Sequence, residues 1–240
     1  MTGRALRVVA VNAGLGQPSS TRMLVDRTVD AVVAELGRRR VDVELSVVDL
    51  REHAVDIARS MNAGFATGSA APAVADVEAA DMLIVATPVF NGSYSGLFKS
   101  FVDLLDRAAM DGTPVIIAAT GGSPRHSMVL DHALRPLFAF LRAVVVPTGV
   151  YAAQEDWAQG DGAHGDGARA VEGGLLDRID RAAAELVALV PMTSPAGPVA
   201  ATSPNVRAVP DDQRTASESA GIATFARLLS RQSAEVGAPH

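Results

Sequence analysis

The stretch that decides the fold is Leu6–Arg22, which reads LRVVAVNAGLGQPSSTR. Its first part, Leu6–Ala13, is almost entirely apolar and rich in valine, which is typical of a strand buried on both faces of a parallel sheet. A loop with two glycines and a proline follows, and Ser19, Ser20 and Thr21 then precede apolar residues at helical spacing. This stretch therefore predicts a buried strand, a tight loop and a helix whose first turn carries three hydroxyl groups.

The same alternation of short apolar runs and longer amphipathic segments continues to residue 190. Apolar runs predict further strands at residues 41–50, 81–87, 114–120 and 144–150. Helical spacing predicts helices at residues 24–36 (ending near Gly37), 73–80, 97–105, 127–142 and 171–190. Small residues and glycines at 51–71 predict a mobile connection, and residues 159–167 a polar glycine-rich loop.

Five strands that alternate with helices predict an α/β fold, with a doubly wound parallel sheet covered by helices on both faces. Five strands favour the flavodoxin-like order 2-1-3-4-5 over the six-stranded dinucleotide-binding order. We expect this domain to cover residues 1–190. Residues 191–240 are rich in proline, alanine and serine, which predicts an extension with a short helix at 219–233.

Composition excludes several classes of function. The 240 residues carry a net charge of −6 without a basic stripe, so we expect no nucleic-acid partner. The absence of cysteine excludes a disulfide scaffold, a thiolate zinc site and a cysteine nucleophile. No apolar run approaches the roughly 20 residues of a membrane span, and no signal core follows the first residues. A cytoplasmic protein without a membrane partner is the expectation.

Ligands of an open parallel sheet bind beyond the carboxyl ends of its strands. After the first strand, Gly14 and Gly16 permit a tight turn, and a helix start with three hydroxyls suits a phosphate. We expect phosphate contacts from Ser19, Ser20, Thr21 and Arg22. Plain helix capping is the alternative. A dinucleotide fingerprint fits poorly, because its third glycine is replaced by a serine.

The loops after the third and fourth strands can enclose a flat ring. In the first of them, turn amides and an aromatic wall from Phe90 and Tyr94 suit a flavin ring, although both aromatics could be ordinary core residues. In the second, two glycines allow close approach of the backbone, and a basic pair adds positive potential. The candidate residues are Pro88, Val89, Phe90, Asn91, Gly92, Ser93, Thr120, Gly121, Gly122, Arg125 and His126.

Other chemistry finds little support in the sequence. No Ser-His-Asp order, HExxH motif or carboxylate pair stands out, and we expect no metal site. His53 and His164 are predicted to lie on the surface. Asp156, Asp161 and Asp166 miss the spacing of a calcium loop and are predicted to be solvated.

Several motifs together resemble one family. In order along the chain, they are Thr87–Lys99 (TPVFNGSYSGLFK), Asp103–Leu105, Ala119–Gly122 and Asp131–Pro136 (DHALRP). They are similar to the NAD(P)H-dependent FMN reductases of two-component alkanesulfonate monooxygenase systems, over about residues 6–153. The resemblance implies FMN as a diffusible substrate or loosely held cofactor, NADPH or NADH as reductant, and a flavin-dependent monooxygenase as partner.

The resemblance also implies where the flavin binds and how the chain associates. The phosphate would lie at Ser19–Arg22, and the ring against Pro88–Ser93 and the glycine pair. A homodimer or homotetramer would form through the helix with the DHALRP motif. That helix can carry a π-bulge in the family, and His132 occupies a position where some relatives have tyrosine, so His132 is either a functional residue or a packed interface histidine. Unlike the family's usual Gly-Ser phosphate loop, this chain has Pro18 before its serines.

The expected activity is reduction of FMN by NAD(P)H, with release of the reduced flavin. The two cofactors carry the hydride chemistry, so no catalytic acid or base is expected. Three alternatives stay open on the sequence. They are a quinone or azo reductase with tightly bound FMN, a non-enzymatic flavodoxin-type electron carrier, and a plain NAD-binding domain.

Overall fold

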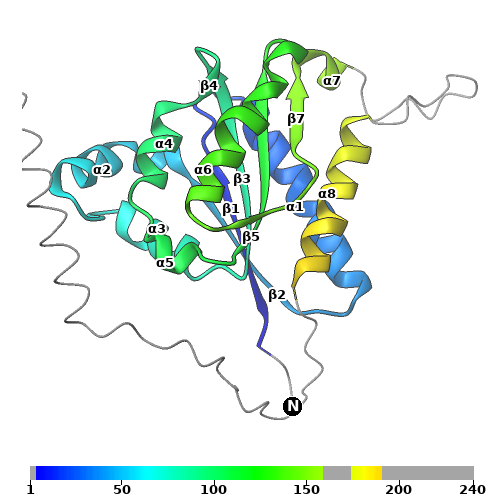
Figure 1. Cartoon of the computed structure of the whole chain (residues 1–240), viewed down its shortest axis with the longest axis horizontal. Helices are drawn as coiled ribbons and strands as arrows, with labels where there is room; N and C mark the ends of the chain where they lie inside the picture. The colour runs from blue at the N-terminus through cyan, green and yellow to red at the C-terminus, as the bar shows by residue number, and fades with distance from the viewer. Residues whose placement is uncertain (1–3, 159–173, 191–240) are drawn as a thin grey trace, which may run out of the picture. The chain divides into compact units, whose positions relative to one another are not determined.

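The computed structural model describes residues 4–158 and 174–190 (Figure 1). These residues form an α/β fold around one predominantly parallel sheet. The predicted loop at 159–167 and the predicted helix at 219–233 lie outside the described residues. No helix in the described ranges has the length and apolar character needed to cross a membrane.

The sheet confirms the predicted flavodoxin-like order. Its path runs β2-β1-β3-β5-β6, with β7 also paired to β5, and all of these pairs are parallel. A short β4 pairs antiparallel with the end of β3. The bounds are β1 Leu6–Asn12, β2 Val43–Asp49, β3 Met82–Phe90, β4 Ser93–Tyr94, β5 Pro114–Gly121, β6 Val144–Val145 and β7 Val150–Ala153.

The fifth strand differs from the prediction of one run over residues 144–150. It consists of β6, which pairs with the start of β5, and β7, which pairs with its end. Pro147 lies between the two segments and has no backbone N–H to donate to a ladder. Strand β7 extends three residues further than expected, to Ala153, and its carboxyl end reaches the same edge as that of β5.

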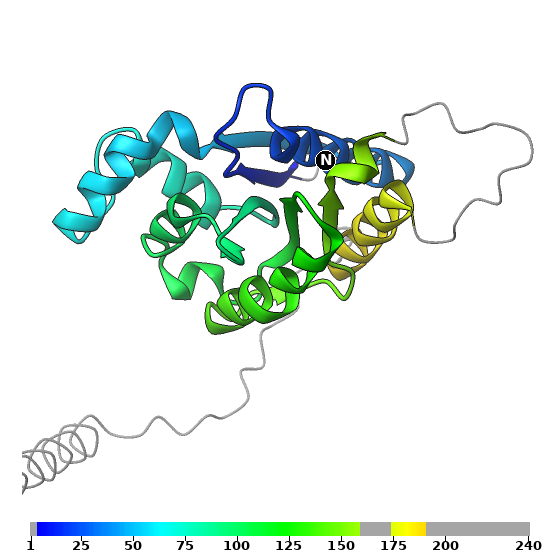
Figure 2. The same ribbon diagram turned by 90° about the horizontal axis from the view of Figure 1, so that it is seen from above.

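Two helical layers cover the sheet, as the view from above shows (Figure 2). On one face, α1 (Ser20–Arg38) and α8 (Leu175–Leu189) pack together over Val8, Ala10 and Ile84. The opposite core contains residues of α2 (Leu50–Ala63), α3 (Ala70–Glu78), α4 (Gly96–Val102), α5 (Arg107–Met110) and α6 (Arg135–Phe140). Helices therefore bury both faces of the sheet, which accounts for the valine-rich strands.

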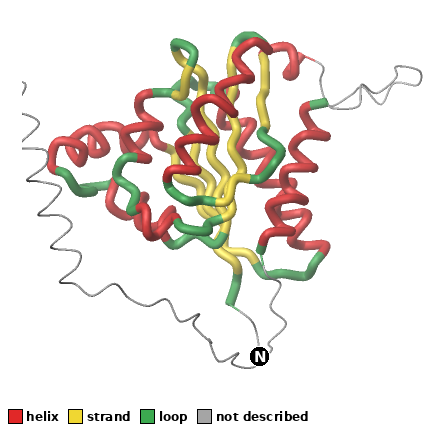
Figure 3. The backbone as a smooth tube through the Cα atoms, viewed as in Figure 1, coloured by secondary structure: helices red, strands yellow, loops and turns green. Residues whose placement is uncertain are grey.

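Three helical predictions need correction. Residues 51–71 are largely helical, because Asp49 caps α2 and Gly64 ends it in the left-handed conformation with φ 79°. Helix α1 does not stop at Gly37 but continues to Arg38. The predicted helix at 127–142 combines three types: a 3₁₀ turn (η1, Pro124–Met128), a π-helix (η2, Leu130–Leu134) and the α-helix α6. Figure 3 draws α6 in red with the other helices.

Candidate functional site

A pocket of about 320 Å³ lies at the carboxyl edge of the sheet. The first turn of α1 contributes to its lining, as do the ends of β3 and β5 and the short helix α7 (Gln154–Ala158) that follows β7. The lining residues are Ser20, Pro88, Val89, Phe90, Thr120, Gly121, Gly122, Gln154 and Trp157. The structure thus brings together parts of all three loops that the sequence singled out.

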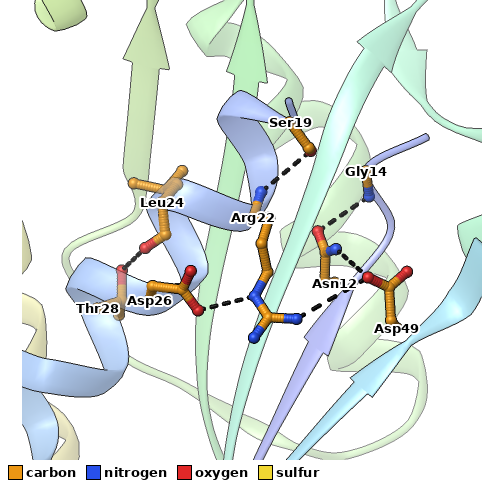
Figure 4. Close-up of polar contacts among 8 residues, drawn as sticks. All are labelled: Asn12, Gly14, Ser19, Arg22, Leu24, Asp26, Thr28 and Asp49. Carbon is orange, nitrogen blue, oxygen red and sulfur yellow. Dashed lines mark hydrogen bonds and ion pairs between the residues drawn. The ribbon is translucent and has the colours of Figure 1, made fainter. Parts of the chain in front are cut away.

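The loop after β1 is folded back by its own hydrogen bonds (Figure 4). The Oδ1 atom of buried Asn12 accepts from the N–H of Gly14 at 3.0 Å, and its Nδ2 atom donates to Asp49 at the end of β2 at 3.1 Å. A Cβ atom at Gly14 would lie only 2.1 Å from the Oγ atom of Ser19. Glycine at this position is therefore required by the close approach of the loop to the helix start.

The three hydroxyl groups at the start of α1 have three different surroundings. Ser19 is the N-cap, and its Oγ atom accepts from the N–H of Arg22 at 3.2 Å. Ser20 is exposed and lines the pocket. Thr21 is buried, and its hydroxyl lies 2.7 Å from that of Thr120 at the end of β5. Ser20 alone of the three therefore lines the pocket, while the other two hold the helix start in place.

Arg22 is turned toward carboxylates. Its Nε atom donates to Asp26 at 2.8 Å, and a second guanidinium nitrogen lies 3.9 Å from Asp49 (Figure 4). Both carboxylates compete with any phosphate for this cation, and Arg22 does not line the pocket. The positive potential of the site comes mainly from the amino end of the 19-residue helix α1, where backbone N–H groups lack helical partners.

The loop after β3 is a tight hairpin. Val89 pairs with Tyr94, and Phe90 pairs with Ser93, across a turn formed by Asn91 (φ 50°) and Gly92 (φ 79°). Two consecutive positive φ values are typical of the turn that Asn-Gly favours between paired strands. The predicted turn is thus present, with Asn91 and Gly92 exposed at its tip and outside the pocket lining.

The two aromatic residues of this hairpin have different surroundings. Phe90 lines the pocket and is 45% exposed, as a ring-binding wall requires. Tyr94 instead packs on the core ring of Phe98, with 6.0 Å between the ring centroids. Of the two aromatics, Phe90 therefore stays a candidate for the wall, and Tyr94 takes the alternative role of a core residue.

The loop after β5 brings backbone close to the pocket. A Cβ atom at Gly121 would lie 2.2 Å from the hydroxyl oxygen of Tyr151, which donates a hydrogen bond to the carbonyl of Ser123 at 2.7 Å. Burial raises the pKa of Tyr151, and the negative charge of Asp156 raises it further. Tyr151 therefore packs against Gly121 and supports this turn as a neutral hydrogen-bond donor to Ser123.

The predicted basic pair lies outside the pocket. Arg125 and His126 are exposed on η1 and belong to none of the residues that line it. His132 is exposed on the π-helix η2, which the resemblance had anticipated. Two surface predictions also change: His53 is half-buried, with its Nδ1 atom fully covered, and Asp156 accepts from the N–H of Ala153 and pairs with Arg178 at 3.4 Å.

Gln154 and Trp157 were missed by the sequence analysis. Both belong to α7, directly after β7, so the signal was the end of the fifth strand. The predicted fifth strand ended at residue 150, whereas β7 continues to Ala153 directly before α7. A strand end in an open parallel sheet is a place where binding residues are expected, and α7 supplies them here.

A second pocket, of about 410 Å³, is lined in part by Tyr151. Its lining includes Asp131 of η2, Asp156 of α7 and Arg178 of α8. None of the residues predicted to bind the flavin lines it. Of these two pockets in the described part of the chain, the edge pocket is the candidate site, because it combines the helix start with the two predicted ring-binding loops.

Comparison with known proteins identifies the family. Residues 6–158 match the model of the NADPH-dependent FMN reductase family. The chain is 42% identical over 151 residues to an FMN reductase (NADPH) of Pseudomonas aeruginosa, which covers 63% of this chain and 78% of the relative. It is 45% identical over 160 residues to the NADH-dependent FMN reductase SfnF of Pseudomonas fluorescens, with 65% and 80% covered.

A solved structure is also similar to this chain. An oxidoreductase from Corynebacterium diphtheriae is 44% identical to this chain and superposes with a TM-score of 0.70, covering 78% of this chain and 98% of that one. The matched residues include the loop after β1, the hairpin, the glycine turn after β5 and α7. The chain belongs to the NADPH-dependent FMN reductase family.

Proposed function

We propose that this NAD(P)H:FMN oxidoreductase binds FMN weakly in the edge pocket and releases the reduced flavin to a separate flavin-dependent monooxygenase. The observation that carries the proposal is the charge of the site. None of the described residues that line the pocket is charged, and Arg22 beside it is already paired with Asp26. A dianionic phosphate would be held by hydroxyls, amides and the helix dipole, which favours exchange over retention.

The residues present fit a flavin mononucleotide. Ser20 and the amino end of α1 would hold the phosphate. Gly121 would lie beside the ring, and Gly14 lets the loop pack against Ser19 at the helix start. Phe90, Val89 and Gly122 would contact the ring. Bound FMN supplies the hydride acceptor for NAD(P)H, and the protein aligns the two rings and excludes water between them.

Release can be tested without knowing the oxygenase. The enzyme, NADPH and FMN are placed anaerobically on one side of a dialysis membrane that retains proteins, with cytochrome c on the other side. Reduced FMN crosses and reduces cytochrome c, whereas NADPH alone does not. Cytochrome c reduction that requires added FMN supports release. Flavin that stays with the protein through dialysis, together with ping-pong kinetics, would instead support the quinone or azo reductase.

We also infer that the chain self-associates through the helical segment at residues 124–140, which combines η1, η2 and α6. Met128 and Phe140 lie on this segment with 59% and 68% of their surfaces exposed, and His132 is exposed between them. Burial of large apolar side chains by a second copy would remove this surface from water. Light scattering tests the inference: the wild type is expected to be a dimer or tetramer, and Met128→Glu should shift it toward monomer. A monomeric wild type contradicts it.

A further inference from the structure

We propose that Trp157 forms one wall of the flavin pocket, against the isoalloxazine ring, and that Arg27 is the positioning residue that holds it there. The proposal rests on the proposed FMN site. Trp157 lines the pocket together with Phe90, Gly121 and Gly122. It is the only tryptophan of the chain, so its position can be followed by its own fluorescence.

The sheet order places the two aromatic residues on opposite sides of the glycine turn. Phe90 ends β3, Gly121 ends β5, and Trp157 follows β7, and β5 is paired with both of its neighbours. The pocket therefore has the glycine turn between two aromatic side chains. A flat aromatic ligand fits such a site, because ring faces and edges attract one another beyond simple burial.

Two interactions position Trp157, one made by its own ring and one made by the residue before it. The guanidinium carbon of Arg27, on α1, lies 5.1 Å from the centroid of the Trp157 ring, which is a cation–π contact. Asp156, the residue before it, accepts from the N–H of Ala153 at 2.7 Å and so anchors the first turn of α7 to the end of β7. The indole is half-buried against the core beneath α1 and α8. It is thus pre-positioned, which lowers the cost of ordering it on binding.

The chain offers a matched control for this arrangement. Arg107 makes a similar contact with Phe140, at 5.2 Å from the ring centroid, and neither residue lines the pocket. Arg27→Met and Arg107→Met therefore remove the same type of contact, near the site in one variant and away from it in the other.

The test measures the affinity of oxidised FMN by equilibrium titration, together with the fluorescence of the bound flavin. Trp157→Ala should weaken FMN binding roughly three- to tenfold, and the bound flavin should become brighter because the quenching indole is gone. Trp157→Phe should retain most of the affinity. Arg27→Met should weaken binding in the same direction and shift the Trp157 emission to longer wavelength, while Arg107→Met should do neither.

The outcomes separate the two proposals. Wild-type protein that does not bind FMN overturns the proposed site itself. Wild-type binding with unchanged affinity and flavin emission in Trp157→Ala overturns the role of Trp157. If that variant does not fold, as judged by circular dichroism, Arg27→Met decides, because it retains the indole: unchanged affinity and tryptophan emission then contradict the inference.

Discussion

The hydroxyl groups of Thr21 and Thr120 lie 2.7 Å apart in a buried hydrogen bond. This bond joins the first turn of α1, where the phosphate is proposed to bind, to the end of β5, where the ring is proposed to bind. The two parts of the site are 99 residues apart in sequence, and this bond couples them directly.

The losses of unfolding free energy in the two single variants of this pair should sum to more than the loss in the double variant. In Thr21→Val or Thr120→Val a buried hydroxyl is left without its partner, which costs about 1–3 kcal/mol of unfolding free energy. In the double variant no hydroxyl is orphaned, so its loss should be well below the sum of the two. Urea unfolding of the four proteins measures this. Strictly additive losses would show that the bond does not form.

Gly14, in the loop after β1, should be essential for FMN binding. In Gly14→Ala the new Cβ atom would overlap the Oγ atom of Ser19, and relief requires that this oxygen leave its capping position. We expect at least a tenfold loss of FMN affinity, measured by titration. The control is Gly37→Ala, since a Cβ there meets nothing within 4 Å and removing a helical glycine should stabilise by about 0.5–1 kcal/mol. Equal affinities in both variants would contradict the assignment of the loop.

Asp26 should weaken FMN binding by holding Arg22. With Asp26→Asn the guanidinium loses its 2.8 Å ion pair and becomes available to the flavin phosphate. One additional exposed ion pair is worth up to about 1 kcal/mol, so affinity should rise roughly two- to fivefold, and more at low salt. Asp30→Asn, exposed one turn later on the same helix, changes net charge equally and is the control. If both variants gain alike, the effect is one of overall charge and not of Arg22.

Tyr151 should make stability sensitive to alkaline pH. Burial, assisted by the charge of Asp156, raises the pKa of Tyr151 above its ordinary value near 10 in the folded state. The unfolded chain therefore releases the proton first, so the stabilisation is complete below pH 10 and is lost as pH rises toward the folded pKa. Chemical unfolding should show a steeper fall above about pH 10 in the wild type than in Tyr151→Phe. Parallel curves would mean that this hydroxyl is not buried in solution.

The sequence was most informative where one segment alone determines the structure. The valine-rich strands and the Asn91–Gly92 turn were predicted because their burial and their φ values follow from the residues themselves. Helix α2 was missed since it buries only Leu50, Ile57 and Ser60, too few for a clear periodic pattern. Its signals were the capping residue Asp49 and the terminating Gly64.

The site was predicted less completely because several of its features depend on tertiary contacts. That Arg22 is held by Asp26 and Asp49 depends partly on the end of β2, and Trp157 is placed by Arg27, which is 130 positions away in sequence. The i,i+4 spacing of Arg22 and Asp26 is a local pattern, whereas the contacts of Arg22 with Asp49 and of Arg27 with Trp157 have none. The loops themselves were found, since the topology of a parallel sheet collects them at one edge.

FMN binding at this site depends on phosphate recognition by the start of α1. The ratio of the affinities for riboflavin and FMN measures this recognition most directly, because the two ligands differ only in the phosphate. The wild type should bind FMN at least tenfold more tightly than riboflavin. The Ser19→Ala/Ser20→Ala variant, which removes the cap and the hydroxyl that lines the pocket, should bring the two affinities close together while riboflavin binding changes little. A preference for FMN that this substitution leaves undiminished would place the phosphate elsewhere and contradict phosphate binding at the start of α1.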